Sequence, residues 1–145
     1  EKLADGILLY NDTYNANPQS MKAALGILAN APAARKVAVV GDMLELGKNT
    51  EMYHKSTGAY AAECGVDILF TLGSLARFIA AGALAAGMSD ENIFVNIDEN
   101  TYSATAAELA GVLREGDILL VKASRAIRAE RVIGCLSDIL VTRSI

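Results

Sequence analysis

Side chains able to bind a nucleotide or an anion gather in three segments of this chain, each following a short apolar run. The first segment, NDTYNANPQSM (11–21), carries Asp12, Asn15 and Asn17. A carboxylate can accept hydrogen bonds from ribose hydroxyls or pair with a cation, and asparagine amides suit a purine edge. The alternative is that Asp12 and Asn15 only shape the turn and that Asn17 only caps the helix that Pro18 begins. In either case we expect Asn17 to be the cap of that helix.

The second segment begins with Gly41 and Asp42 and continues as MLELGKN. Glycine permits close approach of the backbone to a ligand, and an acid at the end of a strand is a common acceptor for ribose hydroxyls. The alternative is an acid that only stabilises a turn. Leu44 and Leu46 alternate with acids, and we expect them to be packing residues.

The third segment, KASRAIRAER (122–131), places Lys122, Ser124, Arg125 and Arg128 near the expected start of a helix. Cations at a helix N-terminus oppose the helix dipole, so their presence there needs a reason. A bound anion, held by Ser124, by helix amides and by the cations, would supply it. A solvated basic face is the alternative.

The sequence lacks the patterns of several other kinds of site. His54 is the single histidine, and we interpret it as structural. Without a second histidine or clustered cysteines, we predict no metal site. No Ser-His-Asp arrangement with a plausible context is present. The chain has neither the GxxxxGK[ST] loop nor the GxGxxG fingerprint, which argues against a P-loop and against a dinucleotide dehydrogenase.

Short β-rich runs alternate with amphipathic stretches of helical length. We expect strands at 7–10, 36–40, 68–72, 93–97 and 118–121. We expect five helices. The first three should be capped by Asn17, with Pro18 as the first helical residue, by Thr50 and by Ser74. The other two should begin around Tyr102 and near Ser124. This alternation predicts an α/β, Rossmann-like fold, with a mainly parallel sheet of about five or six strands and helices on both faces. Ligands of such sheets bind beyond the carboxyl ends of the strands, where the three segments would meet.

Composition narrows the class of protein further. With 145 residues, 52% of them hydrophobic, residues 1–145 suffice for one domain with its own core. A net charge of −4 without a long basic stretch argues against nucleic-acid binding. No apolar run reaches the length of a membrane span, and the start lacks a signal-peptide pattern. Two cysteines fit reduced, buried thiols. We expect a cytoplasmic protein and a monomer.

Together the three segments resemble the C-terminal domain of the Mur ligases, specifically of those that add D-alanyl-D-alanine. NDTYNANPQSM is similar to the family's DSYNANPDSM-type segment, and VVGDMLELG to its LGDMLELG segment. VKASRAIRAERV resembles its VKGSRGMRLERV segment, but Ala123 and Ala126 replace glycines and Ile127 replaces methionine. The order and separation of the segments also match, so the resemblance covers essentially the whole chain.

The resemblance implies an ATP-dependent amide ligase of peptidoglycan precursor synthesis. In that family ATP phosphorylates a carboxylate, and an amine attacks the acyl phosphate. The acceptor would be UDP-N-acetylmuramoyl-tripeptide and the amine D-alanyl-D-alanine. The P-loop, the Mg²⁺ ligands and the UDP-sugar site belong to other domains of the family, absent from this chain. The missing initiator methionine before Glu1 suggests a piece of a longer protein. Alone, the domain would have no catalytic residue and no activity.

The resemblance also assigns residues to the two small substrates. On the nucleotide side it places Asp12, Asn15, Asn17 and Asp42, with Asp42 associated with the ribose. On the side of the D-alanyl-D-alanine carboxylate it places Lys122, Ser124 and Arg125. The residue types by themselves point to the same chemistry. The acids can accept hydrogen bonds from ribose hydroxyls, and the cations at the expected helix start can bind a carboxylate.

Two other classes of function stay open. A stand-alone Rossmann-like module could bind a nucleotide or a partner protein without catalysis. A signalling receiver domain could use Asp42, Ser74 and Lys122, although its acidic cluster would be reduced to Asp12. Uptake of phosphate from a small phosphodonor would separate this second alternative from the ligase.

Overall fold

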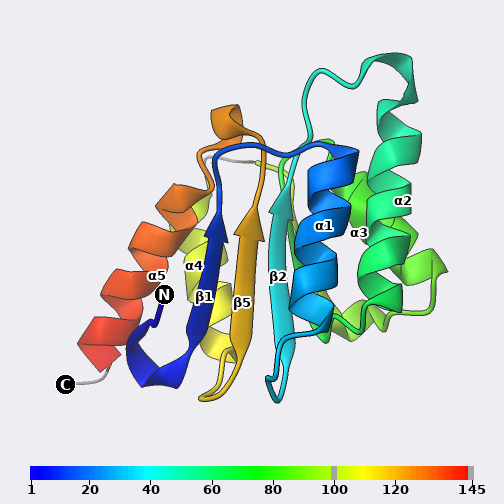
Figure 1. The fold of residues 1–145 in the computed structure, drawn as a ribbon. Helices are drawn as coiled ribbons and strands as arrows, with labels where there is room; N and C mark the ends of the chain where they lie inside the picture. Colours follow the sequence, from blue (N-terminus) through cyan, green and yellow to red (C-terminus); the bar gives the residue numbers. More distant parts are fainter. Residues whose placement is uncertain (99–100, 144–145) are drawn as a thin grey trace.

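The described part of the chain folds around one sheet of five strands that are all parallel (Figure 1). The computed structural model describes residues 1–98 and 101–143. The strands stand in the order β1-β5-β2-β3-β4, and their bounds are Leu8–Asp12 (β1), Lys36–Gly41 (β2), Ile68–Leu72 (β3), Ile93–Asn96 (β4) and Ile118–Lys122 (β5). The last strand of the sequence thus lies between the first two. The predicted α/β, Rossmann-like class is confirmed.

Helices cover both faces of the sheet, as predicted. Their bounds are Pro18–Ala29 (α1), Thr50–Glu63 (α2), Arg77–Ala85 (α3), Tyr102–Val112 (α4) and Glu130–Arg143 (α5). In Figure 1, α1, α2 and α3 lie on one side of the sheet, and α4 and α5 lie on the other. Among the described residues, no helix combines the length and apolar character needed to cross a membrane.

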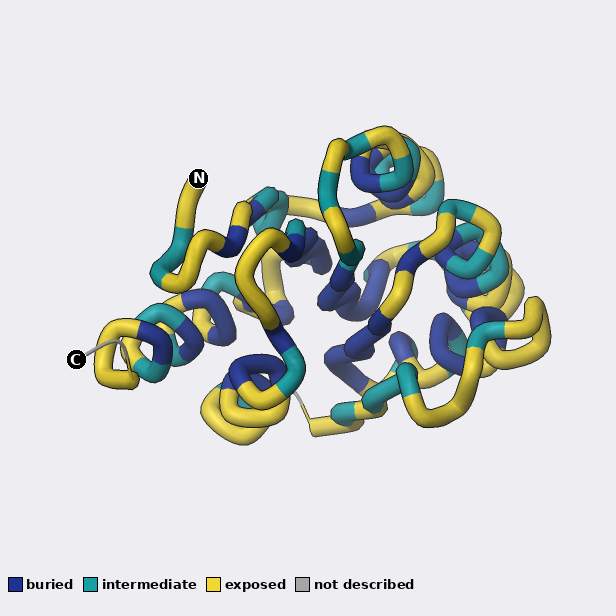
Figure 2. Tube along the Cα trace, turned by 90° about the horizontal axis from the view of Figure 1, so that it is seen from below, coloured by how far each residue is buried: buried dark blue, intermediate teal, exposed yellow. Residues whose placement is uncertain are grey.

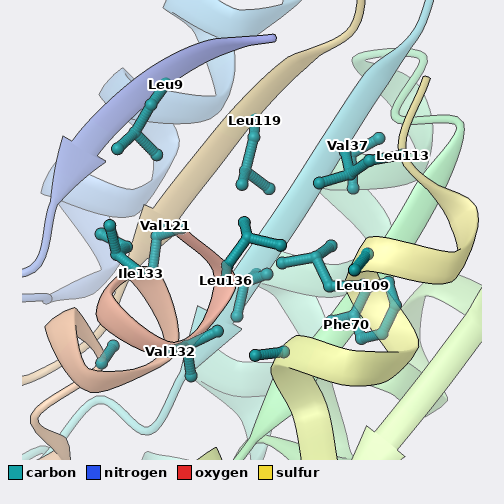
Figure 3. Packing of buried hydrophobic residues seen from close by; sticks show 14 of the residues in the cluster. Leu9, Val37, Phe70, Leu109, Leu113, Leu119, Val121, Val132, Ile133 and Leu136 are labelled. Atoms are coloured by element: carbon teal, nitrogen blue, oxygen red, sulfur yellow. The ribbon is translucent and has the colours of Figure 1, made fainter. Parts of the chain in front are cut away.

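Each face of the sheet has its own hydrophobic cluster. Side chains alternate along a strand, so Leu119 and Val121 pack toward α4 and α5 while Leu120 packs toward α1 and α3. Figure 3 shows Leu109 of α4 and Leu136 of α5 meeting the strand residues of the first cluster. Figure 2 shows burial concentrated in the sheet and on the helix sides that face it. A central sheet buried on both faces explains the nearly continuous apolar runs of β2, β3 and β5.

The helices α2 and α3 pack with their backbones almost in contact. A Cβ atom added to Gly58 would lie 1.8 Å from the carbonyl oxygen of Ile79, and one added to Gly82 would lie 1.9 Å from that of Lys55. Only glycine fits at these two positions. This close packing joins α2 to α3, and α3 in turn packs against β3 and β4.

Three predicted helix starts are wrong. Thr50 does not cap α2 but is its first residue, because a 3₁₀ turn at Gly47–Asn49 leads straight into the helix. Ser74 does not cap α3, which begins at Arg77, and the amide just before this helix bonds to Asp42 of another segment. The last helix begins at Glu130 rather than near Ser124, because Arg128 adopts a left-handed conformation (φ 55°) that a helix cannot continue through.

Both cysteines are free, as predicted, but they are half-buried rather than buried, because each sits at the edge of a hydrophobic cluster. They lie on opposite sides of the sheet. Cys64 packs against the cluster of α1, α2 and α3, and Cys135 packs against the cluster of α4 and α5. The sheet between them keeps the two sulfur atoms from forming a bond with each other.

Candidate functional site

Asp12 and Lys122 end two neighbouring strands and form an ion pair. They are register partners on β1 and β5. Lys122 Nζ donates to Asp12 Oδ2 at 2.7 Å and to the carbonyl oxygen of Asn15 at 2.9 Å. The Lys122 side chain is 3% exposed, whereas that of Asp12 is 30% exposed. Two residues that the family resemblance assigned to different substrates are therefore bonded to each other.

The charge of Asp12 also acts on Tyr10, two residues earlier on β1. Burial first, and then the nearby carboxylate, raise the pKa of the Tyr10 hydroxyl above its ordinary value. Tyr10 and Asp12 are both half-buried, so this strand end is partly shielded from water. Charged interactions here are stronger than on an open surface.

The loop after β1 exposes its two asparagines. Asn15 and Asn17 are both exposed. Asn17 caps α1 through a reciprocal capping box: its Oδ1 accepts from the backbone N–H of Ser20 at 2.8 Å, and Ser20 Oγ accepts from the N–H of Asn17 at 3.0 Å. The prediction that Asn17 is a helix cap is confirmed. Asn15 accepts from Lys122 through its carbonyl and holds its amide at the surface.

Ser124 joins three loops at the carboxyl edge of the sheet. Its hydroxyl accepts from the N–H of Leu44 at 2.9 Å and donates to the carbonyl of Ala16 at 3.5 Å. Its own N–H donates to the carbonyl of Asp42 at 3.0 Å. The side chain is buried at this junction. The segments that follow β1, β2 and β5 are thus linked through one serine.

Asp42 is buried and bonded to the start of α3. It is 4% exposed, and its Oδ1 accepts from the N–H of Ala76 at 2.6 Å. Gly73, with φ 116°, passes so close that a Cβ atom there would lie 2.4 Å from Asp42 Oδ1. A carboxylate suits this place because the amides of a helix start carry partial positive charge. The sequence assigned Asp42 to ribose, and that role stays a prediction.

His54 supports the segment after β2 from α2. It is fully buried, its Nε2 accepts from the N–H of Met43 at 3.0 Å, and its Nδ1 lies 2.6 Å from the carbonyl of Thr50. These partners require the neutral ring with the proton on Nδ1. The structural interpretation of this histidine agrees with its position. The sequence alone did not predict the hydrogen bonds of His54. The spacing of four residues between Thr50 and His54 within one helix is compatible with the bond to the Thr50 carbonyl, but the bond to Met43 has no local signal.

Arg125 lies on the surface near the same edge. Its guanidinium pairs with Glu130 at the start of α5, and its side chain is 61% exposed. Burial raises the pKa of Glu130, but the hydrogen bond from Arg125 and the charges of Arg125 and Arg128 bring it below its ordinary value overall. The predicted cluster of cations at one helix N-terminus does not form, because Lys122 is buried beside Asp12 and α5 begins only at Glu130.

A groove of about 370 Å³ runs between α1 and α2. Its lining includes Lys22, Tyr53, Tyr60 and Glu63. None of the residues that were predicted to bind a ligand lines this groove. The polar side chains with predicted roles lie instead beyond the carboxyl ends of β1, β2 and β5, where parallel sheets bind their ligands. We therefore take this edge, with acceptors from Asp12, exposed amides and the Arg125 cation, as the candidate site. It fits a polar anionic ligand with hydroxyl groups.

Comparison with known proteins identifies the class. The family described as "Mur ligase, glutamate ligase domain" matches residues 1–125. The chain belongs to the Mur ligase family.

Particular relatives share one name, UDP-N-acetylmuramoyl-tripeptide--D-alanyl-D-alanine ligase. The chain is 36% identical to the one from Bacillus subtilis (strain 168) over 91% of its length and 28% of the relative's. It is 34% identical to the one from Escherichia coli (strain K12) over 94% of its length and 28% of the relative's. The chain therefore spans less than a third of these relatives.

Solved structures show the same fold. The crystal structure of MurF ligase from Thermotoga maritima in complex with ADP superposes with a TM-score of 0.81 at 31% identity, covering 99% of this chain and 30% of that one. A crystal structure of MurF from Acinetobacter baumannii gives a TM-score of 0.78 at 27% identity, covering 92% and 28%. The predicted resemblance to the Mur ligases is confirmed.

Proposed function

We propose that this chain is the domain of a D-alanyl-D-alanine-adding Mur ligase that closes over ATP and positions the incoming dipeptide. The observation that carries the proposal is the junction of the three family segments at one edge of the sheet, through Lys122 to Asp12 and through Ser124 to Leu44. The name that the relatives share supports the choice of acceptor and amine.

The proposed reaction joins two substrates at the expense of ATP. The γ-phosphoryl group passes to the terminal carboxylate of UDP-N-acetylmuramoyl-tripeptide and releases ADP. The amine of D-alanyl-D-alanine attacks the acyl carbon, loses a proton, and expels inorganic phosphate as the amide forms. This chain contributes positioning of the nucleotide and the amine, and its closure keeps water from a hydrolysable acyl phosphate. Alone it is inactive under this proposal.

Exposure divides the residues assigned to ligands. Asp12 is part-exposed and the side chains of Asn15 and Asn17 are exposed, so these can meet a nucleotide. Arg125 is exposed and can bind the dipeptide carboxylate when its ion pair with Glu130 breaks. The roles of Asp42 for ribose and of Ser124 for the dipeptide remain predictions, since both side chains already serve protein partners.

The residues of this chain hold no metal ion in the proposed reaction. Within residues 1–98 and 101–143, no group of three or more histidine, cysteine, aspartate and glutamate side chains could hold an ion. Mg²⁺, which ATP chemistry of this family implies, would be held by segments outside this chain.

A chimera tests the function. The part of the Bacillus subtilis relative that aligns with this chain is replaced by residues 1–145, and release of inorganic phosphate is measured with ATP, UDP-N-acetylmuramoyl-tripeptide and D-alanyl-D-alanine. We expect release that requires all three substrates. The control is the relative truncated before this segment, which should release none.

Two outcomes count against the proposal. A folded chimera that releases no phosphate with the dipeptide would contradict it. Because the matching family is described as a glutamate ligase domain, D-glutamate is the second amine to try with the same acceptor. Release with D-glutamate but not with D-alanyl-D-alanine would move this chain to another member of the family.

A further inference from the structure

Lys122 has no room for a ligand beside its two protein partners. Its ammonium donates to Asp12 Oδ2 and to the carbonyl of Asn15, and only 3% of its side chain is exposed. It extends from the end of β5, the strand that lies between β1 and β2. A dipeptide carboxylate at this ammonium would have to displace Asp12, a carboxylate already held at 2.7 Å. Two like charges around one cation oppose each other.

Asp12 is oriented by this pair. Its Oδ2 turns toward Lys122, and no hydrogen bond to Oδ1 is formed within the part of the chain that the structure describes. The side chain keeps 30% of its surface exposed. Lys122 therefore fixes one oxygen of the carboxylate and leaves the other for a hydroxyl group of a ligand. The same ammonium fixes the backbone of Asn15, whose amide is exposed.

We propose that Lys122 is a positioning residue for the nucleotide side of the site: it orients Asp12 and the loop at Asn15, and it does not bind the incoming dipeptide. This inference rests on the proposed function, and it moves Lys122 from the residues that bind the dipeptide to those that position the nucleotide. The substrate that depends on Lys122 is then ATP, although Lys122 stands in the segment assigned to D-alanyl-D-alanine.

The test compares Michaelis constants in the full-length protein that carries this chain. Lys122→Met should raise the KM for ATP about tenfold, because a charge-assisted hydrogen bond that orients a ligand group is lost, and should change the KM for D-alanyl-D-alanine by less than about twofold. Arg125→Met should show the opposite pattern. Lys55→Met removes an exposed lysine paired with Glu51 and should change neither constant.

A double-mutant cycle separates positioning from general damage to the fold. If Lys122 acts through Asp12, then adding Lys122→Met to Asp12→Asn should change the KM for ATP by less than about twofold beyond Asp12→Asn alone. If Lys122→Met fails to fold, Asp12→Asn can be used instead, because it keeps the buried lysine and changes the exposed partner of the ion pair. Its effect on the KM for ATP then tests the role of the same pair. Lys122→Arg, which keeps the charge, should restore part of the affinity for ATP.

The outcomes distinguish the two proposals. An active protein in which Lys122→Met raises the KM for the dipeptide, or in which its effect and that of Asp12→Asn simply add, would overturn this inference and leave the ligase function standing. A folded wild-type protein without dipeptide-dependent phosphate release would overturn the proposed function and, with it, the assignment of Lys122 to ATP.

Discussion

Asp42 shows how one side chain can satisfy two different interpretations of its sequence context. It follows β2, where a ribose acceptor is common, yet its buried carboxylate bonds to the N–H of Ala76 at the start of α3. We expect Asp42→Ala to lower the free energy of unfolding of the 145-residue chain by about 1–2 kcal/mol, the usual cost of losing a side-chain acceptor at a helix start. Urea denaturation measures it.

The control for Asp42 is an aspartate whose carboxylate has no such contact. Asp138 is exposed on α5, and Asp138→Ala should change the unfolding free energy by less than about 0.5 kcal/mol. Equal effects of the two substitutions would mean that the bond to Ala76 contributes nothing to stability. The ribose role makes a separate prediction: in the intact ligase, Asp42→Ala also raises the KM for ATP at a temperature where both proteins are folded.

Local patterns in the sequence predicted some residues of the site and could not predict others. Asn17, Pro18 and Ser20 are near neighbours, so the cap of α1 was readable from spacing alone. Asp12 and Lys122 are 110 positions apart, and their bond depends on a strand order that periodicity does not encode. For the same reason Ser74 was predicted to cap α3, whereas the acceptor at this helix start is Asp42, 34 positions before Ala76.

The contact of α2 with α3 gives a prediction with a matched control. Gly58→Ala would drive a methyl group into the carbonyl of Ile79, 1.8 Å from the new Cβ. Because both groups belong to helix backbones, the helices would have to separate, and we expect a loss of about 2–3 kcal/mol in unfolding free energy. Urea denaturation of the same chain checks this value.

Gly111 provides the control because it sits in α4, and a Cβ atom added there would meet no neighbouring atom within 4 Å. Gly111→Ala should stabilise the chain by about 0.5–1 kcal/mol, since alanine favours the helix and restricts the unfolded state. If both alanine variants shift stability in the same direction, the close crossing of α2 and α3 is not a determinant of stability.

Among the elements, strands were predicted more accurately than helix starts. The apolar runs of β2, β3 and β5 are buried on both faces, so composition alone marks them. The start of α5 depends on Ser124 bonding to Leu44 of a distant loop and on the left-handed Arg128. Neither feature can be recognised from the neighbouring sequence. The predicted start of α5 was therefore wrong, and so was the cluster of cations predicted at that start.

At the scale of the whole molecule, the sheet separates the two cysteines. Cys64 and Cys135 pack on opposite faces, so we expect both thiols to remain free when the chain is purified without reductant. The urea midpoint should then be the same with and without reductant, and mass spectrometry should show both thiols able to react with iodoacetamide after unfolding. A midpoint that falls on reduction would show a disulfide and would contradict this arrangement.

The place of β5 between β1 and β2 has a consequence for folding during synthesis. Of the five strands that the structure describes, the one that pairs with both β1 and β2 is the last to leave the ribosome. Until Ile118 to Lys122 emerge, β1 and β2 each present an unpaired edge, and strand edges of this kind recruit other chains. We therefore expect nascent protein stalled before Ile118 to be prone to aggregation, and we expect the bond between Lys122 and Asp12 to form only after β5 has emerged.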